Sequence, residues 1–392
     1  MSSLLEPVRV GGKLSLRNRV VMGALTRNRC VEDNKPGPAQ ATHYSDRARD
    51  GAGLIVTEGT LIDWTGCHWE HAPFMITTEH ADAWRKVTDA VHNEGGKIFF
   101  QAWHAGRIQH DQMPVKKKHG GAVLAPSAIK AEGGKYRDLP GNPGHTENVA
   151  AIDDPREIVN LYQRSCQLAK EAGFDGVELL AQGGYLPQQF LNSRANKRTD
   201  EYGGSVENRC RFVLEVVDAV AAVFGGPEFI CVRIGPTDHL NDSVVTFDEM
   251  QETYKYLISD LVNRKVGMIN LCRRGAENNG STEFLGINRP EGYPLPKGYD
   301  PILDFGKIVK GPDSSTLLMA NHGYTVEEAD CLIREGKVDL VAFGRPFLYN
   351  PDVVNRIRHG IAFAENDRGS NVFYGPYQTA DENYNDWPAA MV

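Results

Sequence analysis

The sequence lacks the features that mark membrane, secreted and nucleic-acid-binding proteins. No apolar run approaches the ~20 residues that span a bilayer, and the first residues show neither the basic start nor the apolar stretch of a secretory leader. The 43 lysines and arginines are outnumbered by 51 aspartates and glutamates, and the net charge is −8. Such a balance offers no basic face for a phosphate backbone. We therefore expect a cytoplasmic protein with no membrane partner and no nucleic acid partner.

Cysteine is scarce, and several catalytic signatures are missing. The seven cysteines form an odd, scattered set with no C-x-x-C pair, which is typical of free thiols in a reducing compartment. His104 and His110 have no partner at metal-ligand spacing, so we expect no metal site. The chain has no G-x-S-x-G elbow and no G-x-G-x-x-G after its first predicted strand. Neither a serine hydrolase nor a Rossmann-type domain is therefore indicated.

Short apolar runs do recur along the chain, and a helix-like segment follows almost every one. Their continuous apolar character predicts parallel strands that are covered on both faces. Helices are predicted over 79–94, 154–172 and 205–224, and Thr246 and Thr325 are predicted to cap later helices. The eight runs are 19–25, 54–58, 97–103, 176–181, 229–234, 268–272, 316–320 and 340–343.

The eightfold alternation of strand and helix predicts an α/β protein with a (β/α)8 TIM barrel. A doubly wound sheet is the alternative, but it does not need eight repeats. We expect one domain over 1–392, because such barrels use a chain of this length as a single unit. Two stretches exceed an ordinary loop. Residues 109–149, after the third strand, are predicted to form a capping segment, and 273–300, after the sixth, form a second candidate lid.

Polar residues fall where such barrels carry their chemistry, at the carboxyl ends of the strands. Thr26 offers a hydroxyl, Gln101 a carboxamide, and Arg233 and Arg345 offer guanidinium groups. Glycine-rich backbone after the last two strands is typical of a phosphate site. Together these residues predict a phosphorylated aromatic cofactor across the barrel mouth. Purely structural roles remain open, since the arginines can form rim salt bridges and Gln101 can bond loop backbone.

Longer motifs identify a resemblance to a known family. The matching segments are 25–27, 99–107, 173–178, 189–209, 341–347 and 350–352, of which 189–209 reads QFLNSRANKRTDEYGGSVENR. On these motifs, which cover nearly the whole chain, the sequence resembles the Old Yellow Enzyme family of FMN-dependent ene reductases. The resemblance implies a (β/α)8 barrel that binds FMN and takes its electrons from NAD(P)H.

The resemblance also implies which residues contact FMN. Thr26 would bond the flavin O4, Gln101 the pyrimidine edge, and Arg233 would lie near N1 and O2. Arg345 would hold the phosphate. Further contacts are implied for the backbone of Ala24 and Leu25, for His322 (where glycine is usual), for the backbone of Gly323 and Gly344, and for the aromatic pair Phe373 and Tyr374.

The substrate half of the site departs from the family pattern. Tyr185 matches the proton donor, and a phenol can act in this way when it is positioned by its surroundings. The family usually has His and Asn, or two His, just before this tyrosine, and these side chains donate hydrogen bonds to the substrate oxygen. Leu180 and Gly183 stand there instead, and neither side chain can donate. Trp103 and Arg273 are further substrate-facing candidates. Arg273, Arg274 and His104 are candidates to replace the missing donors.

Three hypotheses follow for the activity. The first is an NAD(P)H-dependent FMN oxidoreductase that reduces an activated C=C bond of a bulky or unusual small molecule, with Tyr185 as proton donor, acting as a monomer or homodimer. The second is a non-reductive or oxidative FMN enzyme of a specialised biosynthetic pathway, such as an isomerase, a desaturase or a rearrangement catalyst. Leu180 and Gly183 favour the second. The third, a flavin-free scaffold barrel, is disfavoured by the retained residues Thr26, Gln101 and Arg233.

Overall fold

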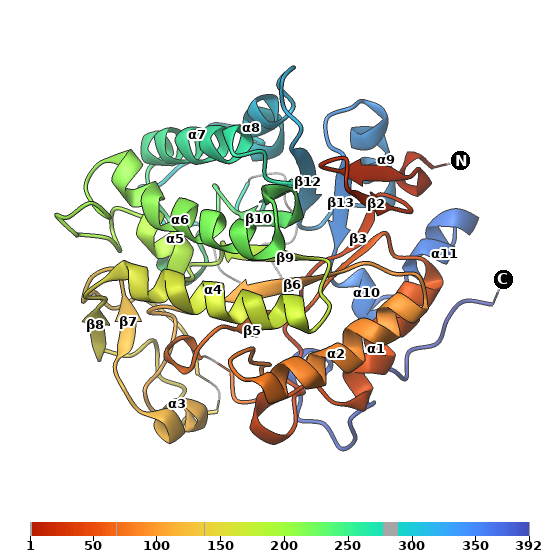
Figure 1. Cartoon of the computed structure of the whole chain (residues 1–392), viewed down its shortest axis with the longest axis horizontal. Coiled ribbons are helices and arrows are strands. Elements are labelled where there is room, and N and C mark those ends of the chain that lie inside the picture. The colour runs from red at the N-terminus through yellow and green to blue at the C-terminus, as the bar shows by residue number, and fades with distance from the viewer. Residues whose placement is uncertain (1, 68, 137, 277–288, 392) are drawn as a thin grey trace.

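Eight parallel strands close into a barrel in the computed structural model, which describes residues 2–67, 69–136, 138–276 and 289–391. Around the barrel each strand pairs with its neighbours in chain order, and the β13–β3 and β4–β6 pairings complete the ring (Figure 1). All eight predicted runs are confirmed as strands. They are β3 (Val20–Met22), β4 (Leu54–Val56), β6 (Ile98–Trp103), β9 (Gly176–Ala181), β10 (Ile230–Ile234), β11 (Met268–Cys272), β12 (Leu317–Asn321) and β13 (Leu340–Phe343). The short strand β5 (Thr60–Leu61) pairs in parallel with the carboxyl-terminal residues of β6.

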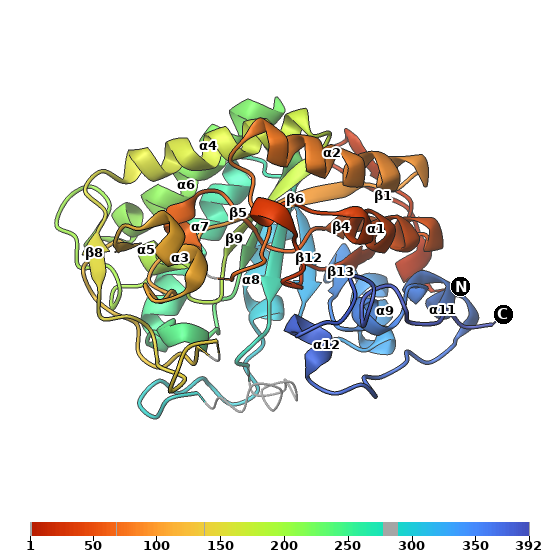
Figure 2. The same ribbon diagram turned by 90° about the horizontal axis from the view of Figure 1, so that it is seen from below.

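Helices surround the barrel on the outside (Figures 1 and 2). The main ones are α1 (Pro38–Asp50), α2 (Thr78–Asn93), α4 (Pro155–Glu171), α6 (Val206–Phe224), α7 (Phe247–Asn263), α8 (Pro301–Val309), α9 (Val326–Arg334) and α11 (Val353–His359). The predicted caps are confirmed, because Thr246 accepts a hydrogen bond from the Glu249 amide and Thr325 forms a capping box with Glu328. Within the described residues, no helix has the length and apolar character needed to cross a membrane.

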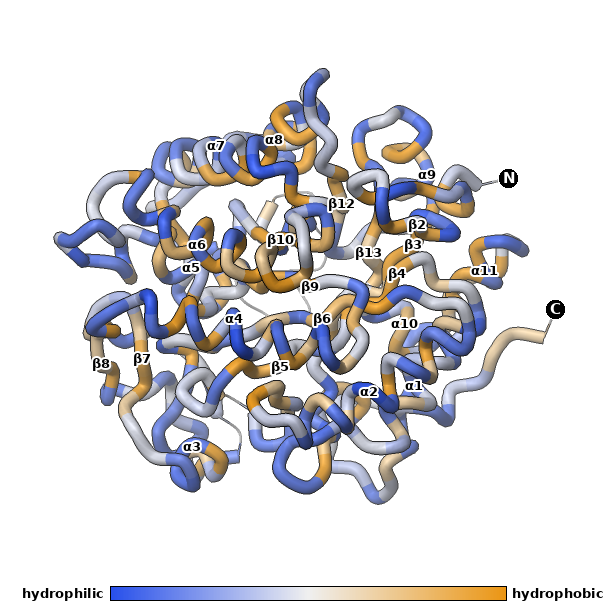
Figure 3. Tube along the Cα trace, in the orientation of Figure 1, coloured by the Kyte–Doolittle hydropathy of each residue, from blue (hydrophilic) through white to orange (hydrophobic). Residues whose placement is uncertain are grey.

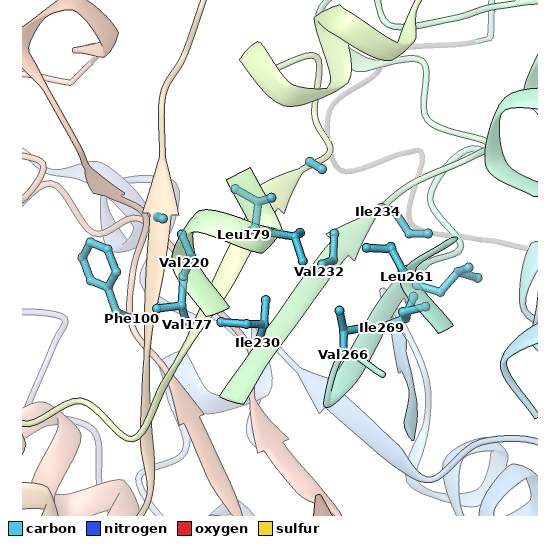
Figure 4. Close-up of a cluster of buried hydrophobic side chains, with 14 of the residues drawn as sticks. Phe100, Val177, Leu179, Val220, Ile230, Val232, Ile234, Leu261, Val266 and Ile269 are labelled. Atoms are coloured by element: carbon cyan, nitrogen blue, oxygen red, sulfur yellow. The ribbon is translucent and has the colours of Figure 1, made fainter. Parts of the chain in front are cut away.

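Two apolar layers build the core. The outer layer lies between the strands and the helices, where Val177 and Ile230 face Val220 of α6 (Figure 4), and in Figure 3 the orange hydrophobic stretches follow the strands. The inner layer fills the barrel itself. At its base the hairpin of β1 (Val8–Val10) and β2 (Leu14–Leu16) packs Val10 and Leu14 into this inner layer. The amino-terminal end of the barrel is therefore closed, which leaves the carboxyl ends of the strands for chemistry.

The predicted capping segment, 109–149, forms α3 (Pro114–His119) and a parallel pair of β7 (Val123–Ala125) and β8 (Val149–Ala151). It lies on the same side of the barrel as α5 (Leu186–Leu191) in both views (Figures 1 and 2). The His119 ring stacks on Trp64 at 3.4 Å between ring centroids, and Ser127 accepts a hydrogen bond from the Lys197 amide. Both contacts join loops that follow carboxyl ends of strands. The segment thus packs around the mouth of the barrel.

The second predicted insertion, 273–300, is described only at its two ends, because residues 277–288 lie outside the described residues. Its first residues continue directly from β11, and its last lead into α8 through the N-cap Asp300. The prediction of a lid over this stretch therefore stays a prediction.

The carboxyl-terminal segment is fastened to the loop that follows β3. Arg27 donates hydrogen bonds to the carbonyls of Val372 and Asn383 at 2.9 and 2.8 Å, and Arg29 stacks over Tyr377 at 3.4 Å from the ring centroid. Beneath them Glu58 is buried and accepts a hydrogen bond from the Arg27 amide at 3.0 Å. A buried carboxyl thus lies under the junction that brings α12 (Asn371–Tyr374) to the mouth.

Glu58 is expected to make stability depend on pH. Its burial raises its pKa from 4.5 to about 7 although hydrogen bonding to Arg27 opposes the shift. Between these values the folded chain binds a proton that the unfolded chain releases, so this contribution is full below pH 4.5 and is lost as pH rises through 7. At about 1.4 kcal/mol per pKa unit, the loss is on the order of 3 kcal/mol. The urea midpoint should fall between pH 5 and pH 8, and less so in Glu58→Gln; equal slopes for both proteins would contradict the assignment.

Candidate active site

The residues predicted to hold the cofactor follow the carboxyl ends of five strands, which meet at one end of the barrel. Ala24, Leu25 and Thr26 follow β3, Gln101 lies in β6, Arg233 lies in β10, His322 and Gly323 follow β12, and Gly344 and Arg345 follow β13. Phe373 and Leu25 pack against one apolar cluster, which places α12 beside the end of β3. The structure therefore brings the predicted set together at one mouth.

Gln101 is held by a buried carboxylate inside the barrel. Its Nε2 donates to Glu178 Oε1 at 2.7 Å, and Asn270 Nδ2 donates to Glu178 Oε2 at 2.7 Å. All three side chains are almost completely buried. Because the register sets Gln101 beside Glu178 on neighbouring strands, the amide is fixed with its nitrogen toward the barrel interior. Sequence reasoning used Glu178 only as part of a strand motif and missed this contact.

A second buried carboxylate links the arginines of two strands. Arg233 Nε donates to Gln182 Oε1 at 2.8 Å, and Gln182 Nε2 donates to Asp238 Oδ2 at 3.0 Å. Arg274 donates to the same carboxylate from Nε, at 2.9 Å, and from Nη2. The Gly183 amide donates to Asp238 Oδ2 at 3.1 Å. These bonds form one network that runs from Arg233 to Arg274.

Asp238 is the anion on which this network depends. Its side chain is completely buried, which by itself would raise its pKa, but the charge and hydrogen bonds of Arg274 outweigh burial and lower the pKa to about 2. The carboxylate is thus ionised at neutral pH. Asp238 is a functional candidate that the sequence did not reveal, since it belongs to no motif and lies within the loop after β10. Gln182 directly follows the end of β9, but its contact with Asp238 was not predicted.

Positive charge gathers around His322. Burial, together with the charges of Arg274, Arg233 and Arg345, lowers the pKa of His322 to about 3, although Asp238 opposes the shift. The residue has a φ of +87°, and Gly323 follows at +71°, a conformation that glycine adopts at little cost and histidine rarely does. The backbone after β12 thus turns as the family's usual glycine would. A mouth with these cations fits a phosphorylated, electron-rich ring such as FMN.

Aromatic side chains border the half of the mouth that is predicted to bind the substrate. Tyr185 lies edge-on to Trp103 at 5.1 Å between ring centroids, and Trp69 lies 4.4 Å from Tyr374 of α12. Leu180 is buried in the same apolar cluster as Trp103. Burial raises the pKa of Tyr185 above 10, with Tyr374 and Asp238 adding to the shift while Arg274 and Arg233 oppose it. The phenol therefore keeps its proton in the physiological range.

Gly183 lies between the Tyr185 ring and Arg274. Its φ is +78°, and a Cβ at this residue would lie 3.0 Å from the Tyr185 ring and 3.6 Å from Arg274 Nη2. Any larger residue would have to adopt the left-handed backbone and press on the tyrosine. The place of the missing family donor is thus bordered by a guanidinium from another loop.

The other candidate donors are engaged elsewhere. Arg273 donates to the carbonyls of His322, at 2.9 Å, and Gly323, at 2.6 Å, and pairs with Glu328. His104 is fully buried, accepts from the Gly106 amide at 3.0 Å and contacts the Thr65 hydroxyl at 3.2 Å. Of the three side chains considered from sequence, Arg274 is the one placed beside Gly183.

Comparisons with known proteins cover nearly the whole chain. The model of the NADH:flavin oxidoreductase / NADH oxidase family matches residues 3–363. A probable flavin mononucleotide-dependent alkene reductase of Leishmania infantum is 35% identical, with 98% of this chain and 97% of that protein covered. For 12-oxophytodienoate reductase 7 of Oryza sativa subsp. japonica the identity is 34%, with 96% and 92% covered. Morphinone reductase in complex with tetrahydroNAD has a TM-score of 0.84 at 36% identity, covering 100% of this chain and 98% of that chain. The old yellow enzyme homologue from Zymomonas mobilis has a TM-score of 0.85 at 29%, covering 99% and 100%.

Proposed function

Because this chain belongs to the NADH:flavin oxidoreductase / NADH oxidase family, we propose that its barrel mouth reduces the electron-poor C=C bond of a bulky or unusual small molecule. The chain is an NAD(P)H-dependent FMN oxidoreductase of the Old Yellow Enzyme type. Its relatives are named as alkene and 12-oxophytodienoate reductases, which does not favour the non-reductive hypothesis. The observation that carries the proposal is the cationic half of the mouth, with Arg233 and Arg345, beside the aromatic half with Tyr185.

The cationic half is proposed to hold FMN. Thr26 would donate to the ring, Gln101 would present its free amide oxygen to the pyrimidine edge, and Arg233 would balance the negative charge of the reduced ring. Arg345 would bind the phosphate together with the backbone after β12 and β13. When bound, FMN accepts hydride from NAD(P)H and returns it to an acceptor. Two of these side chains are held in place before the cofactor arrives, Gln101 by Glu178 and Arg233 by Asp238 through Gln182.

The aromatic half is proposed to hold the substrate. Trp103, Leu180 and Tyr185 form an apolar wall, against which a flat, bulky alkene can pack. Tyr185 donates the proton that completes the reduction, since its raised pKa keeps the phenol protonated. We further propose that segment 109–149 closes this half of the mouth. Its Tyr136 is buried, which raises the pKa of that phenol, and Tyr185 lies near enough to raise the pKa of Tyr136 further.

The whole chain, 1–392, is proposed to act as one FMN-binding domain, since the strands of a single barrel and the loops that follow them supply the residues named above. A cytoplasmic location is also proposed. It is supported by the seven cysteines, all of which are free.

Anaerobic stopped-flow absorbance tests the function. NADPH or NADH is mixed with the yellow protein and should bleach the flavin, and 2-cyclohexenone or 1-nitrocyclohexene added afterwards should restore the colour. Bleaching followed by recovery supports alkene reduction. Bleaching without recovery with any electron-poor alkene would turn the search to other acceptors. A flavin that neither nucleotide bleaches would overturn the proposed electron donor.

A further inference from the structure

Arg274 presents a fixed hydrogen-bond-donating edge at the mouth. Asp238 binds one edge of its guanidinium. Arg274 Nε donates to Asp238 Oδ1 at 2.9 Å, and Arg274 Nη2 donates to Asp238 Oδ2. Asp238 is itself held by the Gln182 amide, the Gly183 backbone and the Leu240 backbone. Within the described part of the chain, no residue accepts a hydrogen bond from Nη1 of Arg274. Among the described residues, Nη1 and the second proton of Nη2 therefore form an edge without an acceptor, which can bind a ligand.

Nη2 of this edge borders the proposed substrate half, while the charge of Arg274 also acts on His322 in the cationic half. Nη2 lies 3.6 Å from the point where a Cβ of Gly183 would stand, and the ring of Tyr185 lies 3.0 Å from the same point. Leu180, whose strand leads to this turn, can make no hydrogen bond with its side chain. A substrate oxygen that approaches Arg274 on this side would therefore have the guanidinium as its charged donor and Tyr185 nearby as the proton source.

The ion pair of Arg274 with Asp238 is suited to stabilise negative charge that develops on a substrate oxygen. The carboxylate of Asp238 balances the guanidinium, so the buried cation is paired and needs no substrate anion to stabilise it. Its donors are nevertheless fixed in place, and fixed donors stabilise negative charge that forms during a reaction. A guanidinium edge also offers two parallel N–H groups, which fit two coplanar oxygens better than one.

We propose that Nη1 and Nη2 of Arg274 bind the oxygens of the substrate's activating group and that Arg274 is a catalytic residue of this chain. The inference rests on the proposed alkene reduction. As a hydride forms the new C–H bond at the β-carbon, the π electrons of the C=C bond move to the activating group, where Arg274 bonds the negative oxygen. A proton from Tyr185 then forms the C–H bond at the α-carbon and is replaced from water. NAD(P)H is oxidised by two electrons and the alkene is reduced by two.

The fork geometry also assigns a substrate class. Alkenes whose activating group carries two coplanar oxygens, such as a nitro or carboxylate group, should be preferred over ketones with one. The size-matched pair 1-nitrocyclohexene and 2-cyclohexenone measures this preference as a ratio of the rates at which the reduced enzyme is reoxidised.

The test compares Arg274→Met and Arg274→Lys with wild type, and Arg264→Met, at the C-cap of the outer helix α7, serves as the control. Arg274→Met should slow reoxidation by 1-nitrocyclohexene by about 10²- to 10³-fold, and Arg264→Met should not. Arg274→Lys retains the charge beside Asp238 but lacks the fork, so its nitro-to-ketone ratio should drop at least about tenfold. Calorimetry adds a readout without turnover: oxidised wild type should bind benzoate more tightly than benzamide, and Arg274→Met should lose that difference.

The outcomes separate this inference from the proposed function. Wild-type reoxidation rates in Arg274→Met, or an unchanged ratio in Arg274→Lys, would overturn the role of Arg274 while flavin reduction by NADPH keeps the function intact. If Arg274→Met does not fold, the lysine variant decides. If neither NADPH nor NADH reduces the wild-type flavin, the proposed function fails. The binding experiment still tests the inference in that case, because equal affinity for benzoate in wild type and Arg274→Lys would overturn it.

Discussion

Tyr185→Phe is expected to slow the reoxidation of the reduced enzyme by an alkene by about 10²- to 10⁴-fold, the usual contribution of a positioned general acid. The phenylalanine ring retains the edge contact with Trp103, so packing is preserved and only the hydroxyl is lost. Flavin reduction by NAD(P)H should stay at the wild-type rate, because it needs no proton from this residue. Stopped-flow measurement of the two half-reactions separates these effects.

Two further observations check the role of Tyr185. Tyr256→Phe is the matched control and should leave both half-reactions unchanged, since Tyr256 lies in α7 and packs against the apolar layer between helices and strands. Because burial holds the pKa of Tyr185 above 10, the rate of reoxidation should show no loss from phenol deprotonation between pH 6 and pH 9. An unchanged reoxidation rate in Tyr185→Phe would remove the tyrosine from the proton-donor role and leave water or another group as the source.

Asp238→Ala is expected to lower the free energy of unfolding by about 3–5 kcal/mol, the usual effect of removing one partner from a buried ion pair. The change leaves Arg274 without its counter-ion and deprives the Gln182 amide and the Gly183 amide of their acceptor. Buried donors without acceptors lose their solvation and regain nothing. The urea midpoint at a fixed, saturating FMN concentration measures the effect, since bound ligand adds its own stabilisation.

The double variant Asp238→Ala with Arg274→Met provides the control for this loss. Removing both charges should recover part of the stability, because no buried cation is then left unpaired. The pH dependence has a defined sign: Asp238 has its pKa lowered from 3.8 to about 2, so its contribution is full above pH 3.8 and is lost as pH falls through 2. A loss below about 1 kcal/mol in Asp238→Ala would mean that solvent reaches the pair.

The sequence predicted the barrel well because the relevant signals are local. A buried parallel strand needs a short apolar run, a helix needs a cap and an apolar face, and both patterns are visible within a few residues. The eight runs, the caps at Thr246 and Thr325, and the residues at the strand ends therefore all lie where they were expected. The resemblance supplied the cofactor, which the comparisons support.

No local sequence pattern predicts the contacts between side chains within the site. Asp238 and Arg274 lie 36 residues apart, and Gln101 and Glu178 lie 77 apart, on different strands and loops. Whether two such side chains meet depends on the register between strands and on the path of each loop, and these are set by packing over the whole barrel. Arg273 and Arg274 illustrate the point, because two adjacent arginines point to different partners, Glu328 for one and Asp238 for the other.

The sequence by itself thus determined the barrel, the end at which chemistry occurs and the absence of side-chain donors at Leu180 and Gly183. Only the tertiary structure decided which other side chain lies beside them. Gly183 turns with a φ of +78° and lies beside the guanidinium of Arg274, which comes from the loop after β11. The buried carboxylate of Asp238 fixes that guanidinium there. The physical reason is that hydrogen bonds between side chains require both partners within about 3 Å. The closure of the barrel brings such partners together, and their spacing along the sequence does not encode it.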